Sequence, residues 1–101
     1  MAVFSAIFSF SNEACITASL NAAASSAAIT IGKERKFAIV ANGAFNLNMG
    51  MAATVPAADA GDFQFPSGQV FTLATNTAAD SVRIYNPNVG AIVYYIQPLA
   101  S

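Results

Sequence analysis

Hydrophobic and polar residues alternate with a period of two along much of this chain, which is the pattern of half-buried β-strands. In residues 45–49, for example, Phe45, Leu47 and Met49 are separated by two asparagines. We expect the three apolar side chains to point into a core and the asparagines to face water or a partner. Similar patterns predict short strands at residues 2–10, 15–20, 27–31, 36–41, 63–65, 69–75, 82–85 and 91–97.

Residues 80–98 contain the best-specified pair of predicted strands. Pro87 fixes φ, the flanking asparagines tolerate left-handed conformations, and Gly90 adopts them without steric cost. The sequence therefore predicts a hairpin with its turn at residues 86–90. The second strand, residues 91–97, is apolar on both faces, with Tyr94 and Tyr95 pointing in opposite directions. Such a strand needs cover on both of its faces.

Two further hairpins are predicted from turn signals. Residues 32–35 join the strands at 27–31 and 36–41, and Asn42-Gly43 favours a type I′ turn between the strands at 36–41 and 45–49. Residues 50–62 show no periodicity and are predicted to form a loop.

Residues 14–28 allow two interpretations. Their alanines favour a helix, whereas their serines, threonines and asparagines compete for backbone hydrogen bonds. We favour a short strand at 15–20 followed by a loop at 21–26.

Apart from the N-terminal residues 1–11, seven or eight short strands separated by turns predict an all-β fold, either a β-sandwich or a jelly-roll-like barrel. The 101 residues fit a single β domain. Residues 1–11 are expected to form an N-terminal arm or strand that contacts a neighbouring subunit.

Only 9% of the residues are charged, compared with about 25% in a typical soluble domain. Because so few charges leave a surface poorly suited to water, we expect other chains to cover much of it. The net charge of −1 gives no overall field that attracts nucleic acid or an anionic membrane. The uncharged stretches are too polar, or too broken by glycine and proline, for a spanning helix. No basic region precedes the first apolar residues, so no cleaved signal peptide is expected.

The inventory of reactive side chains is small. The chain has no histidine, which excludes Ser-His-Asp and Cys-His sites within one chain. We expect a non-enzymatic protein with no catalytic residue, no metal site and no cofactor. Cys15 is expected to be a small buried hydrophobe. Asp59 and Asp62 supply too few ligands for a calcium site and are interpreted as part of a turn.

Three of the four positive charges lie in residues 33–36, but Glu34 interrupts them. This cluster is interpreted as a solvated turn, and contact with nucleic acid is not expected. The aromatic residues are better candidates for assembly, because large apolar rings are enriched at interfaces. The predicted assembly residues are Phe4, Phe8, Phe10, Tyr85, Tyr94 and Tyr95. For the tyrosines, a place in the core and a ligand-stacking platform remain as alternatives.

Residues 75–87, Thr-Asn-Thr-Ala-Ala-Asp-Ser-Val-Arg-Ile-Tyr-Asn-Pro, are followed by Ala-Ile-Val-Tyr-Tyr at 91–95. This arrangement resembles a pattern near the C-terminus of small structural proteins of tailed bacteriophages. The resemblance implies a capsid cement or decoration protein, made in the host cytoplasm and located on the outer capsid surface of the virion. Proteins of that kind are often homotrimers that clamp neighbouring major capsid subunits. The sequence leaves open a head-fibre base, a tail component, or a small carbohydrate-binding or adhesin module.

Overall fold

The computed structural model describes residues 10–52 and 54–100, and this part of the chain forms eight β-strands and no helix. The strands are β1 (Ile16–Leu20), β2 (Ile29–Thr30), β3 (Lys36–Ala41), β4 (Phe45–Gly50), β5 (Phe63–Phe65), β6 (Phe71–Ala74), β7 (Ser81–Tyr85) and β8 (Ile92–Pro98). The predicted all-β fold class is confirmed. Residues 14–28 contain β1 and a loop, as the polar residues among the alanines indicated.

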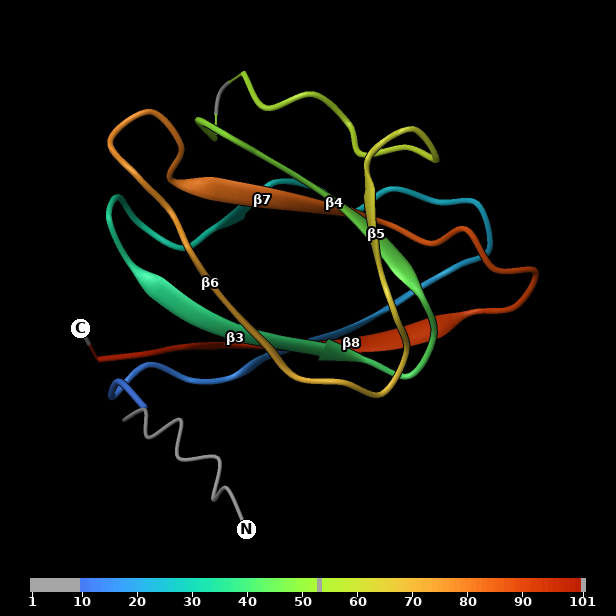
Figure 1. Cartoon of the computed structure of the whole chain (residues 1–101), viewed down its shortest axis with the longest axis horizontal. Helices are drawn as coiled ribbons and strands as arrows, with labels where there is room; N and C mark the ends of the chain where they lie inside the picture. The colour runs from blue at the N-terminus through green and yellow to red at the C-terminus, as the bar shows by residue number, and fades with distance from the viewer. Residues whose placement is uncertain (1–9, 53, 101) are drawn as a thin grey trace, which may run out of the picture.

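The strands form two four-stranded antiparallel sheets. The first sheet has the order β1-β8-β3-β6, and the second has the order β2-β7-β4-β5. In Figure 1, β3 and β8 lie below β4 and β7, with the core between them, while β5 and β6 lie on the side facing the viewer.

The pairing is nested along the chain. β1 pairs with β8, β2 with β7, β3 with β6 and β4 with β5. Two further pairings, β3 with β8 and β4 with β7, complete the sheets. The chain therefore behaves as one long hairpin, closed between β4 and β5, that is rolled into two sheets. Eight strands in two such sheets make a jelly roll.

The three predicted hairpins are wrong, because the two strands of each pair lie in different sheets. β2 and β3, β3 and β4, and β7 and β8 therefore lie on opposite sides of the core instead of pairing side by side. Neither Asn42 nor Gly43 has the positive φ that a type I′ turn requires at both positions. The turn residues were recognised correctly, but each of these turns crosses from one sheet to the other.

The crossing between β7 and β8 is held by the side chain of Asn86, which is fully buried. Its Oδ1 accepts a hydrogen bond from the backbone N of Asn88 at 2.9 Å. Its Nδ2 lies within hydrogen-bond distance of three carbonyl oxygens, those of Leu20 (3.0 Å), Asn21 (3.1 Å) and Gly90 (2.8 Å). Asn86 thus joins the loop after β1 to the loop after β7, a role across the fold rather than within one turn.

The core lies between the sheets and is filled by alternate residues of the strands. The largest completely buried side chains include Phe37, Ile39, Phe45, Ile84 and Ile96. Phe45 stacks on Phe65 with ring centroids 5.1 Å apart. As the alternation predicted, Leu47 and Met49 also pack against this cluster.

The outer face of the second sheet is covered by residues 54–62. Asn46 on this face is buried, and its Nδ2 donates to the carbonyl oxygen of Asp62 at 2.7 Å. Asn48 donates to the carbonyl of Pro56 at 3.3 Å, and Nη1 of Arg83 donates to that of Val55 at 3.3 Å. The expectation that the asparagines face water or a partner is therefore wrong for Asn46, because the loop folds back over it.

Candidate interaction surface

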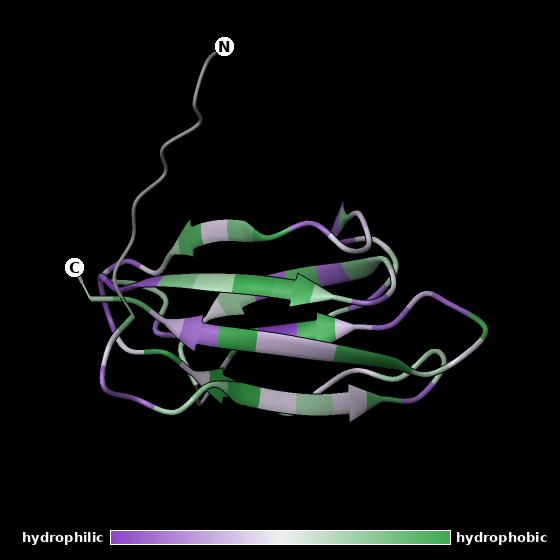
Figure 2. Cartoon of the chain, turned by 90° about the horizontal axis from the view of Figure 1, so that it is seen from below, coloured by the Kyte–Doolittle hydropathy of each residue, from purple (hydrophilic) through white to green (hydrophobic). Residues whose placement is uncertain are grey.

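The outer face of the first sheet has no such loop over it in the described residues. Figure 2 looks onto this sheet, with β6 at the top followed by β3, β8 and β1. Along β8, Ile92, Tyr94 and Ile96 are buried while Tyr95 is 45% exposed, so the predicted alternation is confirmed. Within this part of the chain, the predicted cover for the second face of β8 is missing.

The register of the sheet brings apolar side chains of neighbouring strands together on this face. Tyr95 of β8 lies between Thr17 of β1 and Val40 of β3. The next outward position on β8, Gln97, lies beside Ala38 of β3. Because residues two apart on a strand share a face, these positions form one continuous surface.

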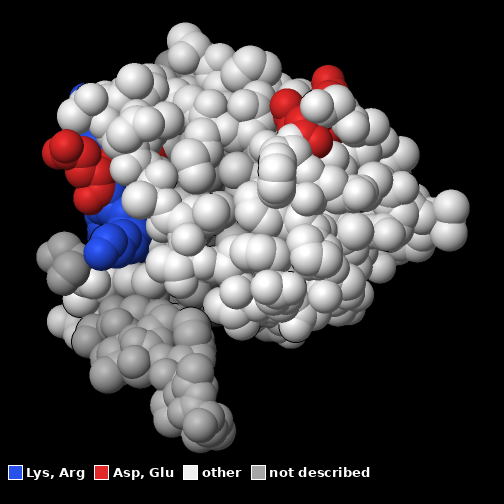
Figure 3. Space-filling view, viewed as in Figure 1, with Lys and Arg blue, Asp and Glu red and all other residues white. Residues whose placement is uncertain are grey.

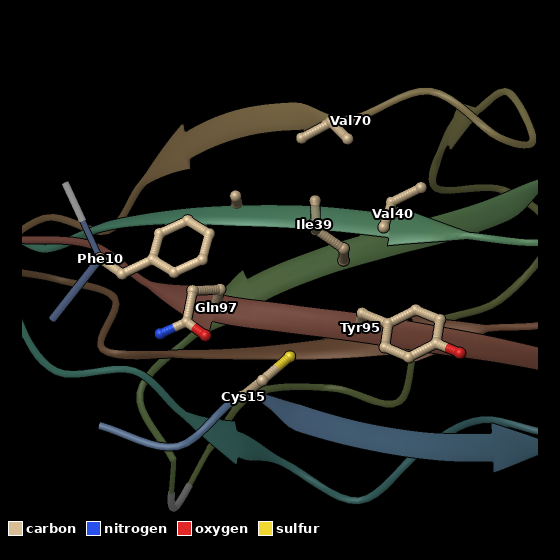
Figure 4. Close-up of a pocket in the computed structure, with 8 residues that line it drawn as sticks. Phe10, Cys15, Ile39, Val40, Val70, Tyr95 and Gln97 are labelled. Carbon is tan, nitrogen blue, oxygen red and sulfur yellow. The ribbon is translucent and has the colours of Figure 1, made fainter. Parts of the chain in front are cut away.

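A shallow open hollow of about 310 Å³ lies on this surface (Figure 4). It is lined by Phe10, Cys15, Ala38, Ile39, Val40, Val70, Tyr95 and Gln97. None of these side chains is charged. In Figure 4, Phe10 and Tyr95 lie at opposite ends of the hollow, and the Tyr95 hydroxyl points away from the other lining side chains.

The polar end of Gln97 is already engaged by the backbone. Its Nε2 donates to the carbonyl oxygens of Glu13 at 3.1 Å and Pro98 at 3.0 Å. The amide donor therefore has partners outside the hollow. The resulting surface offers apolar contact area and a free thiol at Cys15, and its lining includes no histidine and no carboxylate. We name this surface the β8 hollow.

Cys15 is exposed, so the expectation of a small buried hydrophobe is wrong. The residue lies directly before β1, which is an edge strand of the first sheet. Ile16, Ala18 and Leu20 of this strand take the inward positions, which leaves Cys15 outside. The alternation therefore assigns Cys15 to the outer face.

The predicted assembly residues do not form one surface. Phe10 is 63% exposed and lies with Tyr95 in the β8 hollow. Tyr94 belongs to the core cluster, and burial raises the pKa of its hydroxyl. Tyr85 lies on β7, in the other sheet. Phe4 and Phe8 lie outside the described residues.

This separation bears on the ligand-stacking alternative. The three tyrosines cannot form one platform for a sugar ring, because one is in the core and the other two lie on different sheets. The other alternative, a place in the core, applies to Tyr94.

Sequence reasoning missed the contributions of β3 and of Val70, which directly precedes β6. Ala38, Val40 and Val70 line the hollow, and none was proposed as an assembly residue. A signal was available, because residues 37–41 are apolar at every position, like residues 91–96. An unbroken apolar run on a strand indicates that both faces meet apolar neighbours.

Among the described residues, no charged side chain lines the hollow, although the exposed Lys36 shares the outward face of β3 with Ala38 and Val40. Arg35 forms an ion pair with Glu13 and also donates from Nη2 to the carbonyl of Leu99 at 3.4 Å. One member of the predicted basic cluster is therefore engaged within the chain, while Lys33 and Lys36 are exposed. On the face seen in Figure 3, the charged atoms gather in two small groups near the edges and the surface between them is uncharged.

The carboxylates of Asp59 and Asp62 accept hydrogen bonds from backbone groups of the turn that contains them. Asp59 Oδ1 accepts from the backbone N of Gly61 at 2.8 Å, and Asp62 Oδ2 accepts from the backbone N of Asp59 at 2.9 Å. These bonds match the interpretation of an Asp-rich turn. In the described part of the chain, no three His, Cys, Asp or Glu side chains lie close enough to hold a metal ion. No helix capable of spanning a membrane occurs among these residues.

The sequence matches no family model and no curated protein. Its fold is similar to the solution NMR structure of a de novo designed double-stranded β-helix, with a TM-score of 0.58. The two share 12% sequence identity, and the match covers 85% of this chain and 99% of the designed one. At this identity the likeness concerns the fold alone.

Proposed function

We propose that this protein is a non-enzymatic structural protein of a bacteriophage virion. It oligomerises on the outer capsid surface and cements neighbouring major capsid subunits. The observation that carries the proposal is the β8 hollow, an uncharged apolar surface on a chain in which 9% of residues are charged. Surfaces of this composition are typical of permanent interfaces, which resemble a domain core cut in half.

Two further features support the proposal. The segments that resemble phage structural proteins fall on β7 and β8, and β8 carries the outward Tyr95. The core is filled by large side chains, as expected for a protein that works through its surface. The proposed assembly is a homotrimer, which suits a lattice position with local three-fold symmetry.

The mass of the purified protein in solution, measured by light scattering, tests the assembly. We expect a trimer that persists on dilution. Val40→Asp places a carboxylate in the β8 hollow, where contact with another chain would bury the charge unpaired. The dissociation constant of the variant's oligomer should therefore be at least about tenfold higher than that of wild type. Ala22→Asp, on the exposed loop after β1, is the matched control and should leave the mass unchanged.

A monomer at all concentrations would contradict the assembly, and equal effects of the two variants would contradict the role of the hollow. The virion location has its own test. An antibody against the purified protein should label the outer surface of intact phage particles in electron micrographs. If the antibody does not label intact particles, the capsid role is contradicted even if the trimer forms in solution.

A further inference from the structure

The direction of the backbone at Phe10, the first described residue, limits where residues 1–9 can bind. Phe10 forms an antiparallel bridge with Leu99, and the backbone N of Ser11 donates to the carbonyl of Pro98 at 3.2 Å. From there the chain continues as β1, antiparallel to β8, from Ile16 beside Ile96 to Leu20 beside Ile92. Followed in reverse, the described path ends at Phe10, beside Leu99 and just beyond the end of β8.

Phe10 lies at one end of the β8 hollow, and the rest of the lining extends from it back along β8. Its β8 residues, Tyr95 and Gln97, precede Leu99 along the strand. Residues 1–9 would have to reverse direction immediately before Phe10 to cover the hollow of their own chain. They contain no glycine, proline, asparagine or aspartate, and their only turn-favouring residues are Ser5 and Ser9, whose hydroxyls stabilise turns more weakly. The geometry therefore favours the hollow of another copy as their binding site.

Residues 1–9 also have the chemistry and the length that the hollow requires. They carry no charged side chain, and their alternation places Phe4, Ala6 and Phe8 on one face. Nine extended residues span about 30 Å, whereas four strands are about 15 Å across. One such segment can therefore cross the whole outer face of the first sheet and present phenylalanine rings to an apolar surface.

We propose that residues 1–9 of one copy bind in the β8 hollow of a neighbouring copy, with Phe4 and Phe8 against the apolar lining. This inference rests on the self-association in the proposed function and identifies the contact that produces it. The segment supplies the cover that the outer face of β8 lacks. Each copy gives one segment and receives one, so a ring of copies closes without free sites.

Cys15 provides a direct test, because it is the only cysteine and it lines the hollow. The full-length donor variant combines Ala6→Cys with Cys15→Ser and keeps both phenylalanines. It is mixed with full-length wild-type protein of distinguishable mass and oxidised with copper phenanthroline. We expect a disulfide-linked pair of one donor and one wild-type chain on a non-reducing gel.

The control acceptor carries Ala22→Cys with Cys15→Ser, which moves the thiol to an exposed loop outside the hollow. The donor should link to wild-type protein at least about tenfold more than to this control, because docking raises the local thiol concentration. The single variant Ala6→Cys should give linked oligomers rather than an internally bridged monomer.

The possible failures are distinguishable. If light scattering shows an oligomer but the donor links equally, or not at all, to both acceptors, the docking site is wrong and self-association stands. An internal disulfide in the Ala6→Cys monomer would place the segment on its own chain and overturn the exchange. A monomer without any cross-link would overturn both the exchange and the proposed self-association.

Discussion

At the scale of single residues, two buried polar side chains have consequences that can be measured. Asn86 is fully buried and its amide connects two loops, as described above. Tyr94 is 5% exposed in the core, while the adjacent Tyr95 is 45% exposed. Neighbouring tyrosines in such different surroundings allow matched substitutions.

Asn86→Ala should lower the free energy of unfolding by about 2–4 kcal/mol, because buried carbonyl groups lose their hydrogen-bond donor. Denaturation in urea measures the change. Asn12→Ala, at an exposed asparagine, is the control and should stay within about 0.5 kcal/mol of wild type. An equally small effect of Asn86→Ala would show that water replaces the amide.

Tyr94 predicts a decline of stability in alkaline solution. Burial disfavours the phenolate and raises the pKa of Tyr94 above the ordinary value of about 10. As the pH rises past that value, the unfolded chain loses the proton first, so the free energy of unfolding falls. The contribution is fully present below pH of about 10 and is lost as the pH rises through the raised pKa.

Tyr94→Phe should remove part of this decline in unfolding curves recorded between about pH 8 and 11. Tyr95→Phe removes a hydroxyl from the exposed neighbour and should keep the wild-type decline. If both variants follow the wild-type curve, the alkaline loss of stability comes from other groups.

At the scale of elements, the crossings between sheets depend on close contacts at their corners. Gly43 lies between β3 and β4, and a Cβ at this position would clash with Cγ2 of Ile92. Asn88 Nδ2 also lies close by and donates to the carbonyl of Ala44 at 2.8 Å. Glycine is needed at this corner because β8 and the loop before it approach the backbone.

Gly43→Ala should therefore lower the free energy of unfolding by about 1–3 kcal/mol through overpacking. Gly90→Ala is the matched control, because an added Cβ there meets no atom within 4 Å and its φ is not positive. The control should be neutral or slightly stabilising, since alanine restricts the unfolded chain. Thermal or urea unfolding of both variants decides between a requirement for space and a general cost of replacing glycine.

At the scale of the whole molecule, the two sheets present different outer faces. The second sheet is covered by residues 54–62 through hydrogen bonds from Asn46, Asn48 and Arg83. The first carries the uncharged β8 hollow. Among the described residues, the jelly roll therefore has one apolar outer face that no loop covers. The proposed assembly and the exchange of residues 1–9 both account for this face.

The sequence by itself determined the fold class, most strand positions and the face on which each side chain lies. Phe45, Leu47 and Met49 point inward as predicted, and Tyr94 and Tyr95 point in opposite directions. The reason is that side chains alternate along any extended strand, so this property is local to the backbone. The same rule indicated that β8 needs cover on its outer face, which contributes Tyr95 to the candidate surface.

Only the tertiary structure decided which strands pair, which loop covers Asn46 and which apolar residues meet in the hollow. Ile16 pairs with Ile96 from the far end of the chain, while Asn42-Gly43 joins two strands in different sheets. A turn signal shows where the chain bends but not whether the next strand lies beside the last or across the core. That choice depends on contacts distant in sequence, which bury the apolar faces of all strands at once.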